Sequence, residues 1–308
     1  MPFTQSKHCC TTYYFQVMIK LLVRLFDSIF TKSNLRKLDK VVLLAAIFSF
    51  LIHLFLIYLV KNWNFEWSFL QDLSHSYLSA IYTPFSFIIF YEVILIIEAI
   101  PREFPLSIGK QYEVITLILI RRVFKDISEF DSIATWNENA EQMINVGLDL
   151  LGSLLLFFLV GLFYKVYHRN NRGMPKRQQK LIDSEKAIGA LLLLIFVVLS
   201  VYSLYRWTVI HFHLEGNVEV GHVFYKDFFG IMVFFDVLLL LISFIYYQGF
   251  VEIFRNAGFV LTVIIIRISF FAPQLYNVAL LVAAVATGLI TLWLFYNYRD
   301  HFIKTEEK

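Results

Sequence analysis

Long apolar runs recur along the whole chain and constrain its fold more than any other feature. They lie near residues 41–60, 77–100, 144–166, 187–209, 228–251 and 275–297, and two shorter runs, 111–127 and 257–273, contain arginine. A helix that crosses a bilayer needs about 20 predominantly apolar residues. Only 17% of the residues are charged, whereas soluble domains carry about 25%. The sequence therefore predicts an all-α, polytopic transmembrane helix bundle.

The distribution of basic residues predicts the number of crossings and their orientation. Lysine and arginine are concentrated in the N-terminal arm and in residues 165–186, and basic segments stay on the cytoplasmic side. An even number of crossings must separate these two segments, so 111–127 has to cross. The acidic segment 126–141 then lies outside. The same argument makes 257–273 a crossing, which gives about eight helices in the plasma (inner) membrane with both termini cytoplasmic.

These crossings divide the chain into five parts. Residues 18–30 place apolar and basic side chains on opposite sides, as in a helix that lies on the inner leaflet. Met1 and Met18 are both candidate start residues, and no cleavable signal peptide is expected because the first long run begins near Val41. The predicted parts are a cytoplasmic arm (1–40), a first four-helix membrane unit (41–168), a basic cytoplasmic linker (169–186), a second four-helix membrane unit (187–297) and a cytoplasmic tail (298–308).

The two membrane units resemble each other in sequence. VITLILIRRVF at 114–124 aligns without gaps on VLTVIIIRISF at 260–270, which matches Arg121 to Arg267. FIIFYEVILII at 87–97 aligns on IMVFFDVLLLL at 231–241, which sets Glu92 against Asp236. An even number of helices per unit gives both units the same orientation, so they form a parallel tandem repeat about an axis along the membrane normal. Ligand and ion paths often lie near such an axis.

Charged residues inside the predicted helices are the candidate site. Each would cost roughly 2.5–3.5 kcal/mol at the bilayer centre if it faced lipid. With a rise of 1.5 Å per residue, Arg121 lies about 16 Å from Lys110, and Glu92 lies about 12 Å from Ile100. These depths are compatible, so we expect one acid–arginine pair between the second and third helices of each unit. The candidate residues are Glu92, Arg121, Arg122, Asp236 and Arg267, with Asp149 and Glu98 nearer helix ends, where they either extend a polar path or reach water.

The buried charges admit two interpretations. They are either structural clasps between helices or the lining of a path on which a carboxylate exchanges its arginine for a proton or cation. The second interpretation predicts a transporter or channel for a small ion or a proton-coupled solute, with the bilayer as its surroundings. The alternative is a non-transporting membrane scaffold or assembly partner, which suits the acidic outer segment and the basic linker. The near balance of 27 basic and 24 acidic residues argues against a nucleic-acid partner.

The remaining motifs give weaker signals. His211, His213 and His222 could ligate a transition metal, as a membrane metalloenzyme would require, but histidines at the membrane surface give the same pattern. No nucleotide-binding loop, nucleophile elbow or HExxH pattern occurs in the sequence, so we expect neither a cofactor nor an enzyme. Small residues mark expected sites of close helix packing: Gly147, Gly152, Gly161, Ala279, Ala283, Ala284 and Gly288.

Overall fold

The chain is helical throughout the part that the structure describes. The computed structural model describes residues 5–63, 77, 79–128, 140–170, 179–213, 220–246 and 249–306, and it contains no strand within them. This confirms the all-α prediction. The helices are α1 (Gln5–Ile29), α2 (Lys32–Trp63), α4 (Ser79–Ala99), α5 (Phe104–Ser128), α6 (Ala140–Asn170), α7 (Gln179–His213), α8 (Val220–Tyr246), α9 (Phe250–Ser269) and α10 (Gln274–Glu306).

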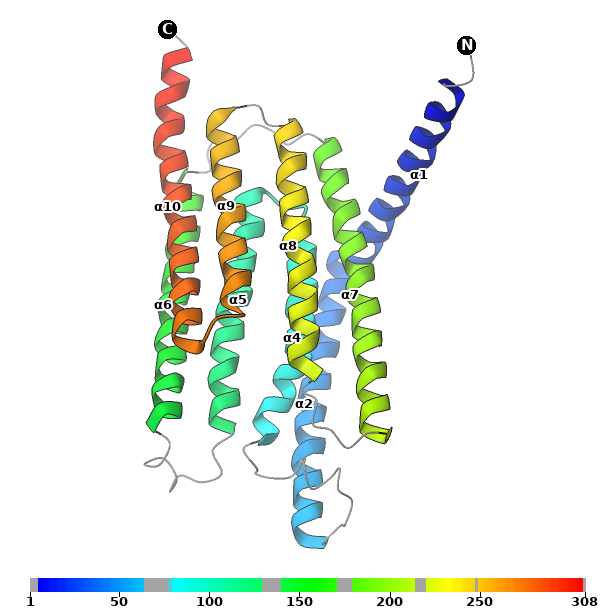
Figure 1. The fold of residues 1–308 in the computed structure, drawn as a ribbon, viewed down its shortest axis with the longest axis vertical. Helices are drawn as coiled ribbons and strands as arrows, with labels where there is room; N and C mark the ends of the chain where they lie inside the picture. The colour runs from blue at the N-terminus through cyan, green and yellow to red at the C-terminus, as the bar shows by residue number, and fades with distance from the viewer. Residues whose placement is uncertain are drawn as a thin grey trace.

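Eight of these helices lie side by side and alternate in direction along the chain (Figure 1). These are α2 and α4 to α10, and helix α1 slants away from one end of the bundle. Both chain ends lie at that same end (Figure 1). The arginine-containing run 111–127 falls in α5, and the run 257–273 begins in α9 and extends four residues past its end at Ser269.

Within the described part of the chain, four helices have the length and apolar composition to cross a membrane, and they lie in α2, α6, α7 and α10. Large apolar side chains on these helices face outward, among them Phe48, Phe157, Val198 and Trp293. A soluble monomer rarely exposes so much contiguous apolar surface. These features indicate a helical membrane protein. The helices α4, α5, α6, α8 and α9 carry the charged residues that the sequence singled out.

The core mixes helices from both halves of the chain. One cluster of buried side chains joins α5 and α6 to α9 and α10, and includes Tyr112, Phe163 and Phe259. A second cluster joins α1, α4, α7 and α8, and includes Phe26 and Phe228. In addition, α6 packs against α10, and α5 contacts α9. The two halves therefore share their packing instead of folding as separate cores.

Glycine allows close helix contact at some of the expected positions. A Cβ atom at Gly152 would lie 2.4 Å from Val278 Cγ1, and one at Gly288 would lie 1.9 Å from the Tyr112 hydroxyl oxygen. Both positions therefore require glycine where α6 meets α10 and where α10 meets α5. The prediction is wrong for Gly147 and Gly161, because nothing lies within 4 Å of a Cβ at either. Those two glycines face open space outside the helix contacts.

Candidate functional site

Glu92 and Arg121 connect α4 to α5. The Arg121 Nη1 atom lies 3.7 Å from Glu92 Oε2, and the carboxylate side chain is almost fully buried. This separation exceeds the roughly 2.7–2.9 Å of a direct charge-assisted hydrogen bond. Among the described residues, Glu92 Oε2 accepts no hydrogen bond. The carboxylate is therefore held by the field of the arginine while one of its oxygens keeps an unfilled acceptor position.

Asp236 and Arg267 repeat this arrangement between α8 and α9. Arg267 Nη2 lies 3.6 Å from Asp236 Oδ2, and both side chains are buried. Asp236 Oδ2 likewise accepts no hydrogen bond within the described part of the chain. The same Nη2 atom donates to Gln111 Oε1 at 3.2 Å, and it lies 3.6 Å from the sulfur of Met232. Gln111 belongs to α5, the helix that also carries Arg121, so the second pair is connected to a helix of the first pair.

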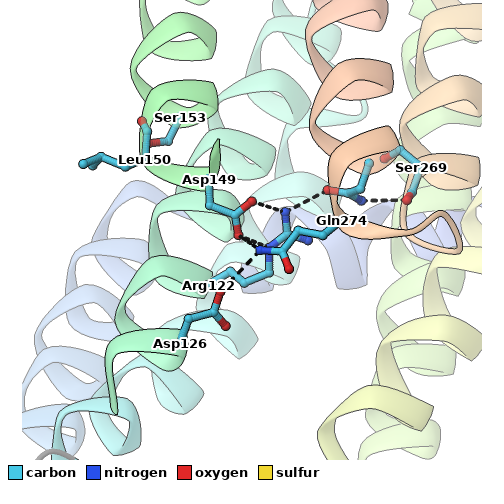
Figure 2. Close-up of polar contacts among 8 residues, drawn as sticks. Arg122, Asp126, Asp149, Leu150, Ser153, Ser269 and Gln274 are labelled. Atoms are coloured by element: carbon cyan, nitrogen blue, oxygen red, sulfur yellow. Dashed lines mark hydrogen bonds and ion pairs between the residues drawn. The ribbon is translucent and has the colours of Figure 1, made fainter. Parts of the chain in front are cut away.

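A third acid–arginine contact has a different construction (Figure 2). Arg122 on α5 grips both carboxylate oxygens of Asp149 on α6, with Nη2 at 2.7 Å from Oδ1 and Nε against Oδ2. Gln274 Nε2 also donates to Asp149 Oδ2 at 3.0 Å and to Asp126 Oδ2 at 3.4 Å. Asp149 is completely buried, whereas the Arg122 side chain is 30% exposed. The Asp149 carboxylate therefore accepts hydrogen bonds on both of its oxygens.

Asn277 extends this contact to the end of α9. Arg122 Nη2 donates to Asn277 Oδ1 at 3.0 Å, and Asn277 Nδ2 donates to the carbonyl oxygen of Ser269 at 2.6 Å. Ser269 is the last residue of α9, and its carbonyl also accepts from the Ala272 backbone N–H, so Asn277 adds a second hydrogen bond at that helix end. We call Arg122, Asp126, Asp149, Gln274 and Asn277 the Asp149 cluster.

The centre of the bundle is held by a neutral contact. The hydroxyl groups of Tyr112 on α5 and Thr262 on α9 lie 2.6 Å apart. Both residues are fully buried, and the Tyr112 oxygen faces Gly288 on α10. These contacts hold α5 and α9 together between the two acid–arginine pairs.

The structure thus joins six of the seven predicted charges in pairs and leaves Glu98 apart. Glu98 forms an ion pair with Arg102 at 2.5 Å, one turn further along the chain, where Arg102 is 46% exposed. Glu98 lies at the end of α4, a position from which a side chain can reach water. The predicted metal ligands His211, His213 and His222 lie outside the described side chains. No group of three or more His, Cys, Asp or Glu among the described residues could hold a metal ion.

Comparison with protein families, curated proteins and solved structures finds no match to this chain. The function is therefore inferred from the site itself. In the three contacts, three arginines face three carboxylates, so the charges balance within these contacts. Two of the three carboxylates keep an oxygen without a hydrogen bond from any described residue.

Sequence analysis missed several polar residues of the site. Gln111, Gln274 and Asn277 are uncharged. An uncharged amide in a membrane helix carries a smaller free-energy penalty than a charge, so it does not stand out in a sequence. Arg255 lies between the apolar runs 228–251 and 257–273, which predicts a place in a short connection. In the structure it is the sixth residue of α9 and is buried, with its guanidinium 4.4 Å from the Phe295 ring centre.

Proposed function

We propose that this protein is a membrane transporter or channel for a small cation or a proton-coupled solute. Its site comprises the pairs Glu92–Arg121 and Asp236–Arg267, one in each of two four-helix units. The observation that carries the proposal is their matching construction. Their ion-pair distances are 3.7 and 3.6 Å, each between equivalent helices of the two units, and each leaves one carboxylate oxygen without a hydrogen bond from a described residue.

The proposal includes eight crossings of the plasma (inner) membrane and a parallel repeat of 41–168 and 187–297. The alternating directions of α2 and α4 to α10 support the crossings (Figure 1). Contacts between α5 and α9, and between α6 and α10, support the repeat. A twofold axis that relates the two units exchanges α5 with α9 and α6 with α10. Because the two helices of each couple contact each other, the axis passes through their contact. The basic segments favour cytoplasmic termini.

The contrast between the two kinds of acid–arginine contact favours a transport path, and not a structural clasp, at Glu92 and Asp236. Asp149 accepts hydrogen bonds on both oxygens, and a bidentate guanidinium grip of this kind fixes geometry. Glu92 and Asp236 keep an oxygen that can accept a proton or a small cation as the guanidinium moves away. A buried carboxylate that exchanges an arginine for a proton or cation is the chemistry that a proton-coupled cycle needs.

Flux through proteoliposomes tests the proposal. Purified protein is reconstituted with a trapped pH-sensitive dye, and gradients of H⁺, Na⁺, K⁺ and a panel of small solutes are imposed. We expect flux above that of empty vesicles, abolished by Glu92→Gln and by Asp236→Asn. The matched control is Asp183→Asn, because Asp183 hydrogen-bonds only its helix neighbour Gln179 in the contacts described and lies at the exposed start of α7. Flux equal to that of empty vesicles across the whole panel would refute transport.

The scaffold alternative predicts the opposite pattern in the same preparation. A scaffold would show no flux, would co-purify with a stoichiometric membrane partner, and would lose stability when either pair is broken. Retained flux in both carboxylate variants would instead leave a transporter whose path avoids these pairs.

Cysteine labelling tests the orientation. Cysteine at Glu138 or Glu219 should react with an impermeant thiol reagent applied from outside the cell. Cysteine at Arg172 should react only after the membrane is permeabilised. Labelling of the Arg172 position in intact cells would overturn the assignment of the termini to the cytoplasm.

A further inference from the structure

The Asp149 cluster connects the two units at one end of the bundle. Arg122 and Asp149 belong to α5 and α6 of the first unit, and Gln274 and Asn277 belong to the first turn of α10 in the second. Asn277 also holds the end of α9 through the Ser269 carbonyl. The sticks in Figure 2 show Arg122 from α5 and Gln274 from α10 converging on the Asp149 carboxylate of α6. One cluster therefore ties four helices together across the boundary between the units.

The charged members of this cluster have no counterpart in the second unit. The alignment that matches Arg121 to Arg267 sets Ile268 against Arg122. The shared Leu-Phe-Tyr at 162–164 and 294–296 sets Leu281 against Asp149. Isoleucine and leucine have hydrocarbon side chains, so this pair of positions cannot form a polar contact. The Arg122–Asp149 contact is therefore an asymmetric addition to an otherwise repeated framework.

The cluster is mechanically connected to the first acid–arginine pair. Arg121 and Arg122 are consecutive on α5, and successive helix residues point about 100° apart, as 3.6 residues per turn requires. Arg121 accordingly faces Glu92 on α4 while Arg122 faces Asp149 on α6. A rotation of α5 about its own axis that draws Arg121 away from Glu92 therefore also moves Arg122 away from Asp149.

We propose that the Asp149 cluster is a latch between the two units, closed in this structure, that opens in each transport cycle. This inference rests on the proposed function. The end that it closes is the one where α5 ends and α6 begins. The partial exposure of Arg122 gives water a route to the carboxylate as the latch opens, while the bidentate contact and the Asn277 bridge hold it shut at rest.

A disulfide beside the cluster can lock it. Gly152 lies one turn from Asp149 on α6, and a Cβ at this position would lie 3.6 Å from Val278 Cβ on α10. Disulfides have Cβ separations of about 3.5–4.5 Å. The test variant is Gly152→Cys with Val278→Cys, in a Cys9→Ser, Cys10→Ser background. The control is Gly258→Cys with Thr291→Cys, where the separation is 3.4 Å and both positions lie in the second unit.

Proton flux is measured in proteoliposomes after oxidation and again after reduction, with crosslinking read by mass spectrometry. We expect both disulfides to form, and only the Gly152–Val278 bond to abolish flux, with recovery on reduction. Full crosslinking at that site with unchanged flux would overturn the latch and leave the transport proposal standing. Failure of the pair to crosslink would overturn the closed contact. Absence of flux in the unmodified protein would refute the proposed function, and the latch with it.

Discussion

Arg122 and Asp149 differ in their access to water, and this difference predicts unequal costs for removing either partner. Asp149 is completely buried, whereas 30% of the Arg122 side chain is exposed. Substituting Arg122→Gln leaves a buried carboxylate without its cation, which costs roughly 3–5 kcal/mol of unfolding free energy. Substituting Asp149→Asn leaves a guanidinium that can turn toward water, and the new amide keeps part of the hydrogen bonding. We expect this substitution to cost about 1–2 kcal/mol.

Equilibrium unfolding in mixed detergent and SDS micelles, followed by tryptophan fluorescence, measures these differences. The double substitution Arg122→Gln, Asp149→Asn should recover most of the loss, because contacting residues are not additive. Glu98→Gln is the matched control. Its partner Arg102 is 46% exposed and can turn to water, so loss of the pair should cost at most about 1 kcal/mol. An Asp149→Asn variant less stable than Arg122→Gln, or losses for both no larger than the control, would refute the argument from burial.

Three further predictions concern the repeat and the centre of the bundle. Glu92→Gln and Asp236→Asn should behave alike, each abolishing flux with little change in the unfolding midpoint, and different behaviour at the two sites would count against the repeat. Gly288→Ala should lower the free energy of unfolding by about 1–3 kcal/mol, because the new methyl group meets the Tyr112 oxygen. Gly147→Ala, with open space around it, should be neutral or stabilising by up to about 1 kcal/mol. Equal SDS midpoints for those two variants would contradict the packing. Tyr112→Phe should cost about 1 kcal/mol through the lost hydrogen bond and should lessen the harm of Gly288→Ala; simple addition of the two losses would argue against the contact.

The sequence predicted what depends on local pattern. Apolar runs of sufficient length gave the helices, and charge placement identified 111–127 and 257–273 as further helices despite their arginines. The burial of Asp149 could not be predicted in this way. A carboxylate near the end of a helix reaches water in most arrangements, and Gln274, 125 positions further along the chain, helps to enclose it.

Small residues showed the same limit. Gly147, Gly152 and Gly161 recur along α6, yet only Gly152 faces a neighbouring helix closely. Which face of a helix packs depends on the orientation of its neighbours. In a protein whose lipid-facing and buried surfaces are both apolar, the sequence alone carries little information about that orientation.

Helix α1 has a consequence for the order in which the protein is assembled. Phe26 packs against Gly189, and Lys186 Nζ binds Asp27 at 2.7 Å across 159 positions of chain. Helix α1 therefore finds its partner, α7, only after the intervening helices α2, α4, α5 and α6 have been made. During that interval Phe26 lacks its contact at Gly189 and Asp27 lacks its partner Lys186. Ribosome-bound chains truncated before residue 186 should accordingly leave α1 accessible to protease.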